Sequence, residues 1–388
     1  MSLHNVLALR AARSLVHFVH SDVNWRQVFS GANVSLGYVR NAAVWPVPDA
    51  VLVDGVNSGT RYCALEFKPP NSSKSECIRG LGQTISYLAE YDSAALILPD
   101  RADDGYQIAQ HIADLISRPA ATQPRVGVYA YPVATANLSL TTPFTMALLK
   151  PIGGLAPALR ASVRPRLERT FWAFWRDTSL YEMFLVLDRA DRLAGTSGVR
   201  NQSLRYAYKE YAALRTKDPQ GKSRRSAGIP ERDFTGHTAV TLSHLGLWEE
   251  DGVLTVAGRH LVHTGRLFGP LSAPFRDAFA RQALLAGRHY EFIKLVYEFQ
   301  RNQPGSYAKA EDFAQALQVF LDSEGLLLRL PNRTTTGSRR FFQYELTFWG
   351  IILGIIRKHG RSYVVPGVGL DFDWPRILDL LAGSDLLG

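Results

Sequence analysis

The sequence predicts an α/β (α+β) domain followed by mostly α-helical domains. In the first 150 residues, short β-like runs alternate with segments whose apolar residues recur at helical spacing. Further along, helical spacing dominates, and turns that contain Gly or Pro separate the segments. With 46% hydrophobic and 20% charged residues, the 388-residue chain has enough apolar material for more than one core.

The first elements can be placed in chain order. A helix is expected over residues 3–20, and a first strand near Val34–Val39. The β-like runs Ala50–Val53 and Tyr62–Phe67 flank the turn-forming segment Gly55–Gly59, so they are predicted to form a hairpin.

The alternation continues after the hairpin. Ser73 and Glu76 form an S-x-x-E capping box, which opens a helix over about residues 75–91 and makes Glu76 a helix cap in place of a metal ligand. A short apolar run of the kind that is buried in a sheet follows at Ala94–Leu98. A helix is then expected near residues 106–117 and a strand at Val126–Val133.

The net charge of +9 is concentrated in the middle of the chain. Residues 151–240 contain 16 Lys and Arg against 9 Asp and Glu, whereas residues 1–150 contain 12 against 11 and residues 241–388 contain 16 against 15. This distribution fits a chain that grips a polyanion beyond an N-terminal catalytic region. A merely solvated basic surface is the alternative explanation.

Several classes of protein are excluded by the sequence. The two cysteines, Cys63 and Cys77, provide no disulfide framework and no zinc-ribbon module. The apolar run Phe348–Ile356 is too short to span a bilayer, and no G-x-x-x-x-G-K-[ST] phosphate-binding loop occurs. We therefore expect a cytoplasmic protein without a signal peptide, a membrane span or a nucleotide cofactor.

Three residues around the predicted hairpin carry candidate chemistry. Because alternate side chains of a strand share a face, Glu66 and Lys68 point the same way. Asp49 lies at the start of the first hairpin strand, where its side chain can meet them. Two carboxylates can hold a hard cation such as Mg2+ through oxygen, and a lysine can position or polarise an attacking water. In a regular strand Asp54 is expected to face the side opposite to Asp49, and a β-bulge would reverse this.

The arrangement of Asp49, Glu66 and Lys68 resembles the active site of the PD-(D/E)xK nuclease superfamily, the fold of many restriction endonucleases. The expected order of elements is similar to the α-β-β-β-α-β core of that fold. The resemblance implies that Mg2+, or Mn2+ in its place, is bound by Asp49, Glu66 and the backbone carbonyl of Phe67, while Lys68 orients the water. Several relatives add a carboxylate from the first helix, and this chain has none there.

The helix after the lysine strengthens the resemblance. Gln83 and Tyr87 are four residues apart and therefore share a helix face. They match the Q-x-x-x-Y element of RecB-like members of the superfamily, in which it supports the active site and contacts DNA. The resemblance thus adds Gln83 to the candidate catalytic residues. The histidines at other positions are expected to be structural or solvent-facing: His17, His20, His237, His244, His260 and His263.

Candidate DNA contacts lie further along the chain. Residues 151–204 are predicted to be a helical connector, whose aromatic residues Phe171, Trp172, Phe174, Trp175, Tyr181 and Phe184 fit core packing better than a stacking surface for bases. The loop Arg215–Arg232 is rich in Gly, Pro, Ser and basic residues. Its candidate phosphate contacts are Lys217, Lys222, Arg224 and Arg225.

Two later regions, 205–284 and 285–388, look like winged-helix units. In the first, a helix ends at Gly246, and an Asp251–Gly252 turn links two short strands before the next helix. In the second, a helix ending at Gly325 leads into two strands around a long basic wing, with Arg333, Arg339 and Arg340 as candidate DNA contacts. Winged helices bind DNA through a helix in the major groove and a wing on the backbone or minor groove, or they dock proteins.

Together, these features predict a catalytic domain over residues 1–150, the connector and two DNA-binding domains. The expected function is a Mg2+-dependent, sequence-specific endonuclease of the type II restriction class, which cuts double-stranded DNA as a homodimer and leaves 5′-phosphate and 3′-hydroxyl ends, as the family implies. A target that carries a modified base, such as a methylated one, is equally compatible with the residues. Two alternatives stay open: a transposon-end nuclease with a transposase partner, and a non-catalytic DNA-binding regulator.

Overall fold

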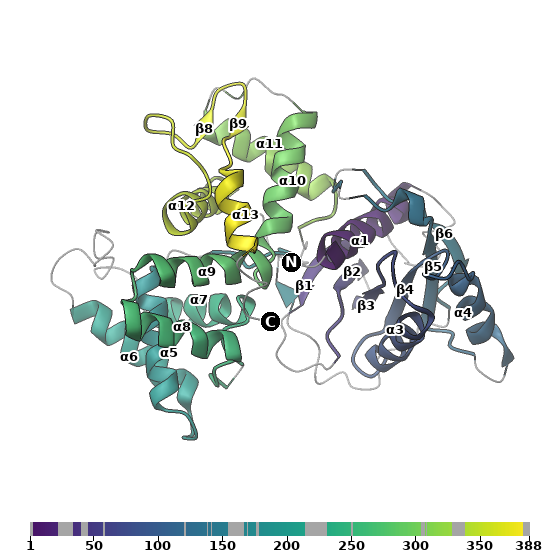
Figure 1. Ribbon diagram of the computed structural model, residues 1–388, viewed down its shortest axis with the longest axis horizontal. Helices are drawn as coiled ribbons and strands as arrows, with labels where there is room; N and C mark the ends of the chain where they lie inside the picture. Colours follow the sequence, from purple (N-terminus) through teal and green to yellow (C-terminus); the bar gives the residue numbers. More distant parts are fainter. Residues whose placement is uncertain are drawn as a thin grey trace. The chain divides into compact units, whose positions relative to one another are not determined.

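The computed structural model describes most of the chain, and the described residues fall into two compact units (Figure 1). The first unit is built from Met1–Phe171, Ile293–Asn302 and Ala316–Thr335, and the second from Trp172–Phe292, Gln303–Gln315 and Thr336–Gly388. The described residues are 3–21, 34–39, 46–56, 59–119, 122–137, 139–140, 142–153, 167–168, 170–175, 178–213, 231–249, 251–303, 307, 309–327 and 338–382.

The first unit contains a mixed seven-stranded sheet with the order β6-β5-β4-β3-β2-β1-β7. Its central pairs β3–β4 and β4–β5 are parallel, whereas β1–β2, β2–β3, β5–β6 and β1–β7 are antiparallel. The strands are β1 (Val34–Val39), β2 (Ala50–Val56), β3 (Gly59–Phe67), β4 (Ser93–Pro99), β5 (Val126–Tyr131), β6 (Ala147–Lys150) and β7 (Leu167–Glu168). Every residue of β4 and β5 is buried, as expected for central parallel strands.

Helices cover both faces of this sheet. On one face, α3 (Lys74–Tyr87) and α4 (Ile108–Ser117) pack on Ala64, Leu96 and Val128. On the other face, α1 (Leu3–Ser21) contacts β1, β2 and β3 (Figure 1). The predicted order of elements in the N-terminal region, including the first strand, is confirmed, while β6 and β7 were not predicted.

The later parts of the chain complete the first unit. Arg13 of α1 forms an ion pair with Glu324, and the backbone N–H of Leu36 donates to the carbonyl of Gly325 over 2.7 Å. The rings of Phe299 and Phe320 pack with their centroids 4.9 Å apart. The sheet therefore does not derive its packing from the N-terminal residues alone.

The second unit is helical in its described residues, apart from short β pairings. Its elements are α5 (Leu180–Arg192), α6 (Val199–Ala213), α7 (Glu231–His244), α8 (Val256–Phe268), α9 (Ala273–Leu285), α12 (Ser338–Thr347), the π-helix η3 (Phe348–Leu353), β8 (Val364–Val365), β9 (Gly369–Leu370) and α13 (Trp374–Ala382). Helices α10 (His289–Asn302) and α11 (Ala310–Ser323) are each divided between the two units.

Aromatic residues form the core of the second unit. The ring of Trp172 stacks on Phe292 with centroids 3.7 Å apart, and Trp175 stacks on Phe348 at 4.3 Å. Both tryptophans are buried. The interpretation of these two side chains as core packing is therefore confirmed, and they provide no stacking surface for bases.

The hairpins predicted in the second unit differ from the structure. Around Asp251 and Gly252, the two expected strands are reduced to one bridge between Trp248 and Leu254. The second strand expected after the long wing is wrong, because Ser338–Thr347 forms α12. The high strand propensity of the phenylalanine, tyrosine and threonine residues in this segment favoured a strand.

The buried positions in that region nevertheless follow a helical spacing. Phe342, Glu345, Leu346 and Trp349 are all buried, at intervals of three and four residues.

Within the described residues, no helix combines the length and the apolar character needed to cross a membrane.

Candidate active site

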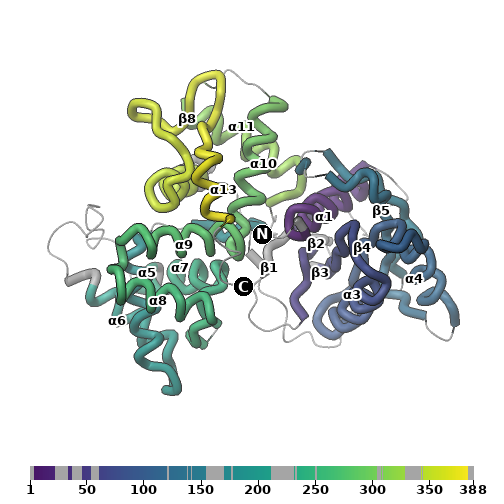
Figure 2. The backbone as a smooth tube through the Cα atoms, in the orientation of Figure 1, coloured from purple at the N-terminus to yellow at the C-terminus, as the bar shows by residue number. Residues whose placement is uncertain are grey.

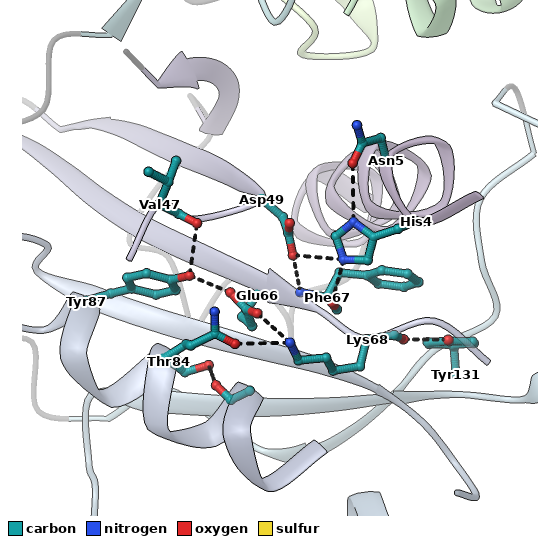
Figure 3. Close-up of polar contacts among 12 residues, drawn as sticks. His4, Asn5, Val47, Asp49, Glu66, Phe67, Lys68, Thr84, Tyr87 and Tyr131 are labelled. Carbon is teal, nitrogen blue, oxygen red and sulfur yellow. Dashed lines mark hydrogen bonds and ion pairs between the residues drawn. The ribbon is translucent and has the colours of Figure 1, made fainter. Parts of the chain in front are cut away.

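Glu66 and Lys68 lie side by side at the end of β3, facing α3 (Figure 3). The ammonium group of Lys68 donates to Oε1 of Glu66 over 2.8 Å and to Oε1 of Gln83 over 3.1 Å. The shared face predicted from strand alternation is therefore present, and Gln83 of α3 reaches the same group.

Asp49 joins them from the start of the hairpin. The register pairs Ala50 with Leu65, so Asp49 lies opposite Glu66, one step further along. Its Oδ2 accepts a hydrogen bond from the backbone N–H of Phe67 over 2.8 Å, and its own backbone N–H donates to the carbonyl of Leu65 over 2.9 Å. These bonds fix the carboxylate beside the end of β3.

The two carboxylates interact electrostatically. Glu66 is only 4% exposed, and burial, followed by the nearby charge of Asp49, raises its pKa above the usual range. Hydrogen bonds from Lys68 and Tyr87 and the charge of Lys68 act in the opposite direction. A cation placed between the two carboxylates would relieve their repulsion.

Tyr87 holds the second oxygen of Glu66. Its hydroxyl donates to Oε2 of Glu66 and also lies 3.2 Å from the carbonyl oxygen of Val47. Burial, and then the charge of Glu66, raise the pKa of Tyr87, so the hydroxyl stays protonated and remains a donor. Both residues of the Q-x-x-x-Y pair therefore touch the candidate site.

The first turn of helix α3 and one glycine in it help to place this helix beside Lys68. Ser73 and Glu76 form the predicted capping box, which confirms Glu76 as a cap. At Gly80, an added methyl group would lie 2.5 Å from Cε of Lys68 and 3.3 Å from a methyl group of Leu96. Glycine thus lets the lysine side chain cross the helix at close range.

His4 of α1 is a neighbour of the site that sequence reasoning missed. Its Nε2 lies 3.0 Å from the carbonyl oxygen of Phe67 and 3.5 Å from Oδ2 of Asp49 (Figure 3). Since a carbonyl only accepts, Nε2 carries the proton in this contact. The ring also packs edge-on against Phe67. Its position, at the start of an otherwise apolar helix face, was the available signal.

Phe67 itself is fixed on the opposite face of the sheet. Its ring stacks on Tyr131 with centroids 5.4 Å apart, and the Tyr131 hydroxyl donates to the carbonyl of Lys68 over 2.7 Å. The backbone between Glu66 and Lys68 is therefore held by Asp49 at the N–H of Phe67 and by Tyr131 at the carbonyl of Lys68. These contacts orient the Phe67 carbonyl, which is one of the predicted metal ligands.

The donor set fits a hard divalent cation. Carboxylate and carbonyl oxygens are the ligands that Mg2+ and Mn2+ prefer, and Asp49, Glu66 and Phe67 supply these groups close together. Within the described residues, no three His, Cys, Asp or Glu side chains form a ready metal cluster. The predicted set needs only two such side chains, because its third ligand is a backbone carbonyl.

The predicted DNA contacts have side chains that the structure does not describe. The backbones of Arg339 and Arg340 belong to α12, and their side chains lie outside the described part of the structure. The same holds for the side chain of Asp54 in β2. The candidates that lie outside the described residues altogether are Lys217, Lys222, Arg224, Arg225 and Arg333.

Comparison of the chain with protein-family models and with curated proteins found no match.

Proposed function

We propose that the protein is a metal-dependent endodeoxyribonuclease with the restriction-endonuclease-like fold. The observation that carries this proposal is the convergence of Asp49, Glu66 and Lys68 at the end of β3. A buried carboxylate, Glu66, beside the partly exposed carboxylate of Asp49, with a lysine hydrogen-bonded to Glu66, is suited to phosphodiester hydrolysis.

Asp49, Glu66 and the carbonyl of Phe67 would hold Mg2+, or Mn2+ in its place. When bound, the cation supplies a Lewis acid for the phosphoryl oxygen and lowers the pKa of a bound water. The chain's own contribution is to hold these oxygens in place: Phe67 N–H fixes Asp49, and Tyr87 and Lys68 fix Glu66.

Lys68 would orient the nucleophile. An ammonium group has three N–H donors, and within the described residues two of them are used for Glu66 and Gln83. The third is available to the attacking water or to a phosphate oxygen. Water attack at phosphorus with departure of the 3′-oxygen gives 5′-phosphate and 3′-hydroxyl ends.

We assign the protein to the type II restriction class acting on double-stranded DNA as a homodimer, with a sequence or a modified base as the target. The basic excess of residues 151–240 supports a polyanionic substrate. A duplex needs two cuts, and the described residues of each chain contain one candidate site, which supports a dimer on DNA.

The test is cleavage of plasmid DNA, unmodified or carrying methylated cytosine or adenine, with Mg2+ or with EDTA. Wild-type protein should give discrete Mg2+-dependent bands, and Lys68→Ala should lower the rate by roughly 10²- to 10⁴-fold while it retains DNA binding. The substrate that is cut identifies the required modification. Absence of cutting on all of these substrates, with tight DNA binding intact, would favour the partner-dependent nuclease or the regulator.

A further inference from the structure

The described residues contain a basic β element in the second unit that differs from both predicted wings. After η3, residues 355–373 form two successive tight turns joined by short β pairings, which we call the basic hairpin. Bridges pair Ile356 with Phe372 and His359 with Ser362, and β8 pairs with β9. The two loops stand out from the helices of their unit (Figure 2, yellow).

The base of the basic hairpin is firmly anchored. Ile355, Ile356 and Phe372 are buried, and Phe372 packs on Trp349 with ring centroids 6.0 Å apart. Backbone bonds of 2.8 Å join Arg357 N–H to the carbonyl of Asp371 and Asp373 N–H to the carbonyl of Ile355. The element is therefore a pre-formed ridge, so a ligand need not order it on binding.

Its outer turn presents Arg361 at the apex. His359 and Ser362 exchange backbone hydrogen bonds of 2.8 and 3.1 Å around the two-residue loop Gly360–Arg361. Gly360 has φ +60°, as a hairpin turn with glycine at its first central position requires, whereas Arg361 does not have positive φ. Arg361 is exposed and has no hydrogen-bond or ion-pair partner among the described residues.

The charges around the turn separate into paired and unpaired groups. Arg357 lies 3.3 Å from Asp373, and His359 lies 2.8 Å from Asp371, so each of the two acids of the element already has a basic side chain as a neighbour. Lys358, exposed beside the turn, has only the ring of Tyr363 nearby among the described residues, with Nζ 5.7 Å from its centroid. The uncompensated cations are thus Lys358 and Arg361, at the outermost part.

We propose that the basic hairpin binds the phosphate backbone of double-stranded DNA through Lys358 and Arg361. A narrow, rigid ridge with two cations at its tip is complementary in charge to phosphates along a groove, as wings are in other DNA-binding folds. The inference rests on the proposed function for its choice of polyanion. It assigns to residues 355–373 the wing role that was expected for the basic segment with Arg333, Arg339 and Arg340.

The test is equilibrium binding of full-length protein to a mixed-sequence duplex in EDTA, measured from about 50 to 200 mM salt. Lys358→Ala and Arg361→Ala should each weaken binding roughly 5- to 10-fold near 0.1 M salt and lower the salt slope of log K by about one. Arg361→Lys should restore most of the affinity, because a phosphate contact needs the charge and not the guanidinium fork.

Lys309→Ala is the matched control, since it removes one exposed positive charge of the same unit at a distance in sequence. It should leave the salt slope unchanged, and thermal unfolding of every variant should match that of wild type. Equal binding by the hairpin variants and Lys309→Ala would overturn the inference. Because binding is measured without Mg2+, cleavage by wild type together with that result would leave the proposed function standing. Hairpin-dependent binding without any cleavage would support the inference and contradict the proposed nuclease activity.

Discussion

At the scale of single residues, the hydroxyl of Tyr87 acts directly on Glu66. Its hydrogen bond lowers the pKa of Glu66, which burial and Asp49 raise. We expect Tyr87→Phe to raise the pKa of Glu66 further, so a higher pH is needed to ionise the carboxyl for cation binding. The acidic limb of the cleavage rate against pH should move to higher pH, and the maximal rate should fall roughly tenfold.

Tyr91→Phe is the matched control for this change. The Tyr91 hydroxyl is buried without a hydrogen-bond partner in the described part of the chain, and its ring packs edge-on against Tyr87. Removing it should leave the pH–rate profile where it is. An identical profile for Tyr87→Phe and wild type would show that the hydroxyl does not act on Glu66.

A second residue-scale prediction concerns a buried acid far from the candidate site in sequence. Glu345 accepts a hydrogen bond from Nε1 of Trp172 over 2.8 Å, and its other oxygen lies 3.8 Å from Nδ1 of the buried, neutral His289. Burial raises the pKa of Glu345 to about 8. The folded state therefore keeps a proton that the unfolded chain releases above about pH 4.5.

This difference in protonation between the folded and unfolded states sets the direction in which stability changes with pH. Between about pH 4.5 and 8 the folded state binds more protons, so this group makes the protein less stable as pH rises, by about 1.4 kcal/mol per pH unit. Glu345→Gln, which mimics the neutral acid, should remove this slope. Thermal unfolding from pH 5 to 8 measures it, and parallel curves for the two proteins would contradict the prediction.

At the scale of the element, α3 is the helix that connects fold and chemistry. Gly80→Ala should increase intrinsic helix stability by up to about 1 kcal/mol while displacing the stem of Lys68, which the new methyl group approaches. We expect a folded protein that cleaves more slowly. Gly82→Ala is the control in the same helix, because that position is exposed and an added methyl group would have no atom from outside the helix backbone within 4 Å.

Gly82→Ala should gain the same helix stability at unchanged activity. The two variants are compared by thermal unfolding and by initial cleavage rates under identical conditions. If both cleave like wild type, the position of the lysine stem does not limit the reaction.

Elements with local signals were predictable from the sequence. The hairpin around Glu66 had turn residues between two β-like runs, and α3 had its capping box. In contrast, the strand predicted in the region of α12 is wrong. The strand propensities of single residues favoured it, whereas the buried residues Phe342, Glu345 and Trp349 recur at helical spacing. The contact of His4 with Phe67 depends on how α1 crosses the sheet, which no local pattern specifies.

At the scale of the whole molecule, the sheet unit draws on three separate parts of the chain. A fragment of residues 1–171 lacks Glu324, the partner of Arg13, and Phe299 and Phe320, which pack on each other in the same unit. We expect this fragment to unfold at a markedly lower temperature than the full chain and to lose cleavage. Circular dichroism during heating measures this, and a cooperative transition at the temperature of the full chain would contradict it.

This composite unit also explains a limit of prediction from sequence. A boundary after residue 150 follows the composition of the chain, because the Gly/Pro-containing segment Pro151–Pro157 comes next. The return of Ile293–Asn302 and Ala316–Thr335 to the first unit depends on tertiary contacts between residues far apart in sequence.

Asp49 and Glu66 are proposed to form a cation site, and this site can be tested by calorimetric titration of the full-length protein with Mn2+. Wild type should bind Mn2+, Asp49→Asn should bind at least roughly tenfold more weakly, and Asp114→Asn, which removes an exposed carboxylate on α4, should bind like wild type. The Asn side chain can still accept from Phe67 N–H, so the change removes charge with little effect on the fold. Equal Mn2+ affinity in wild type and Asp49→Asn would contradict the account.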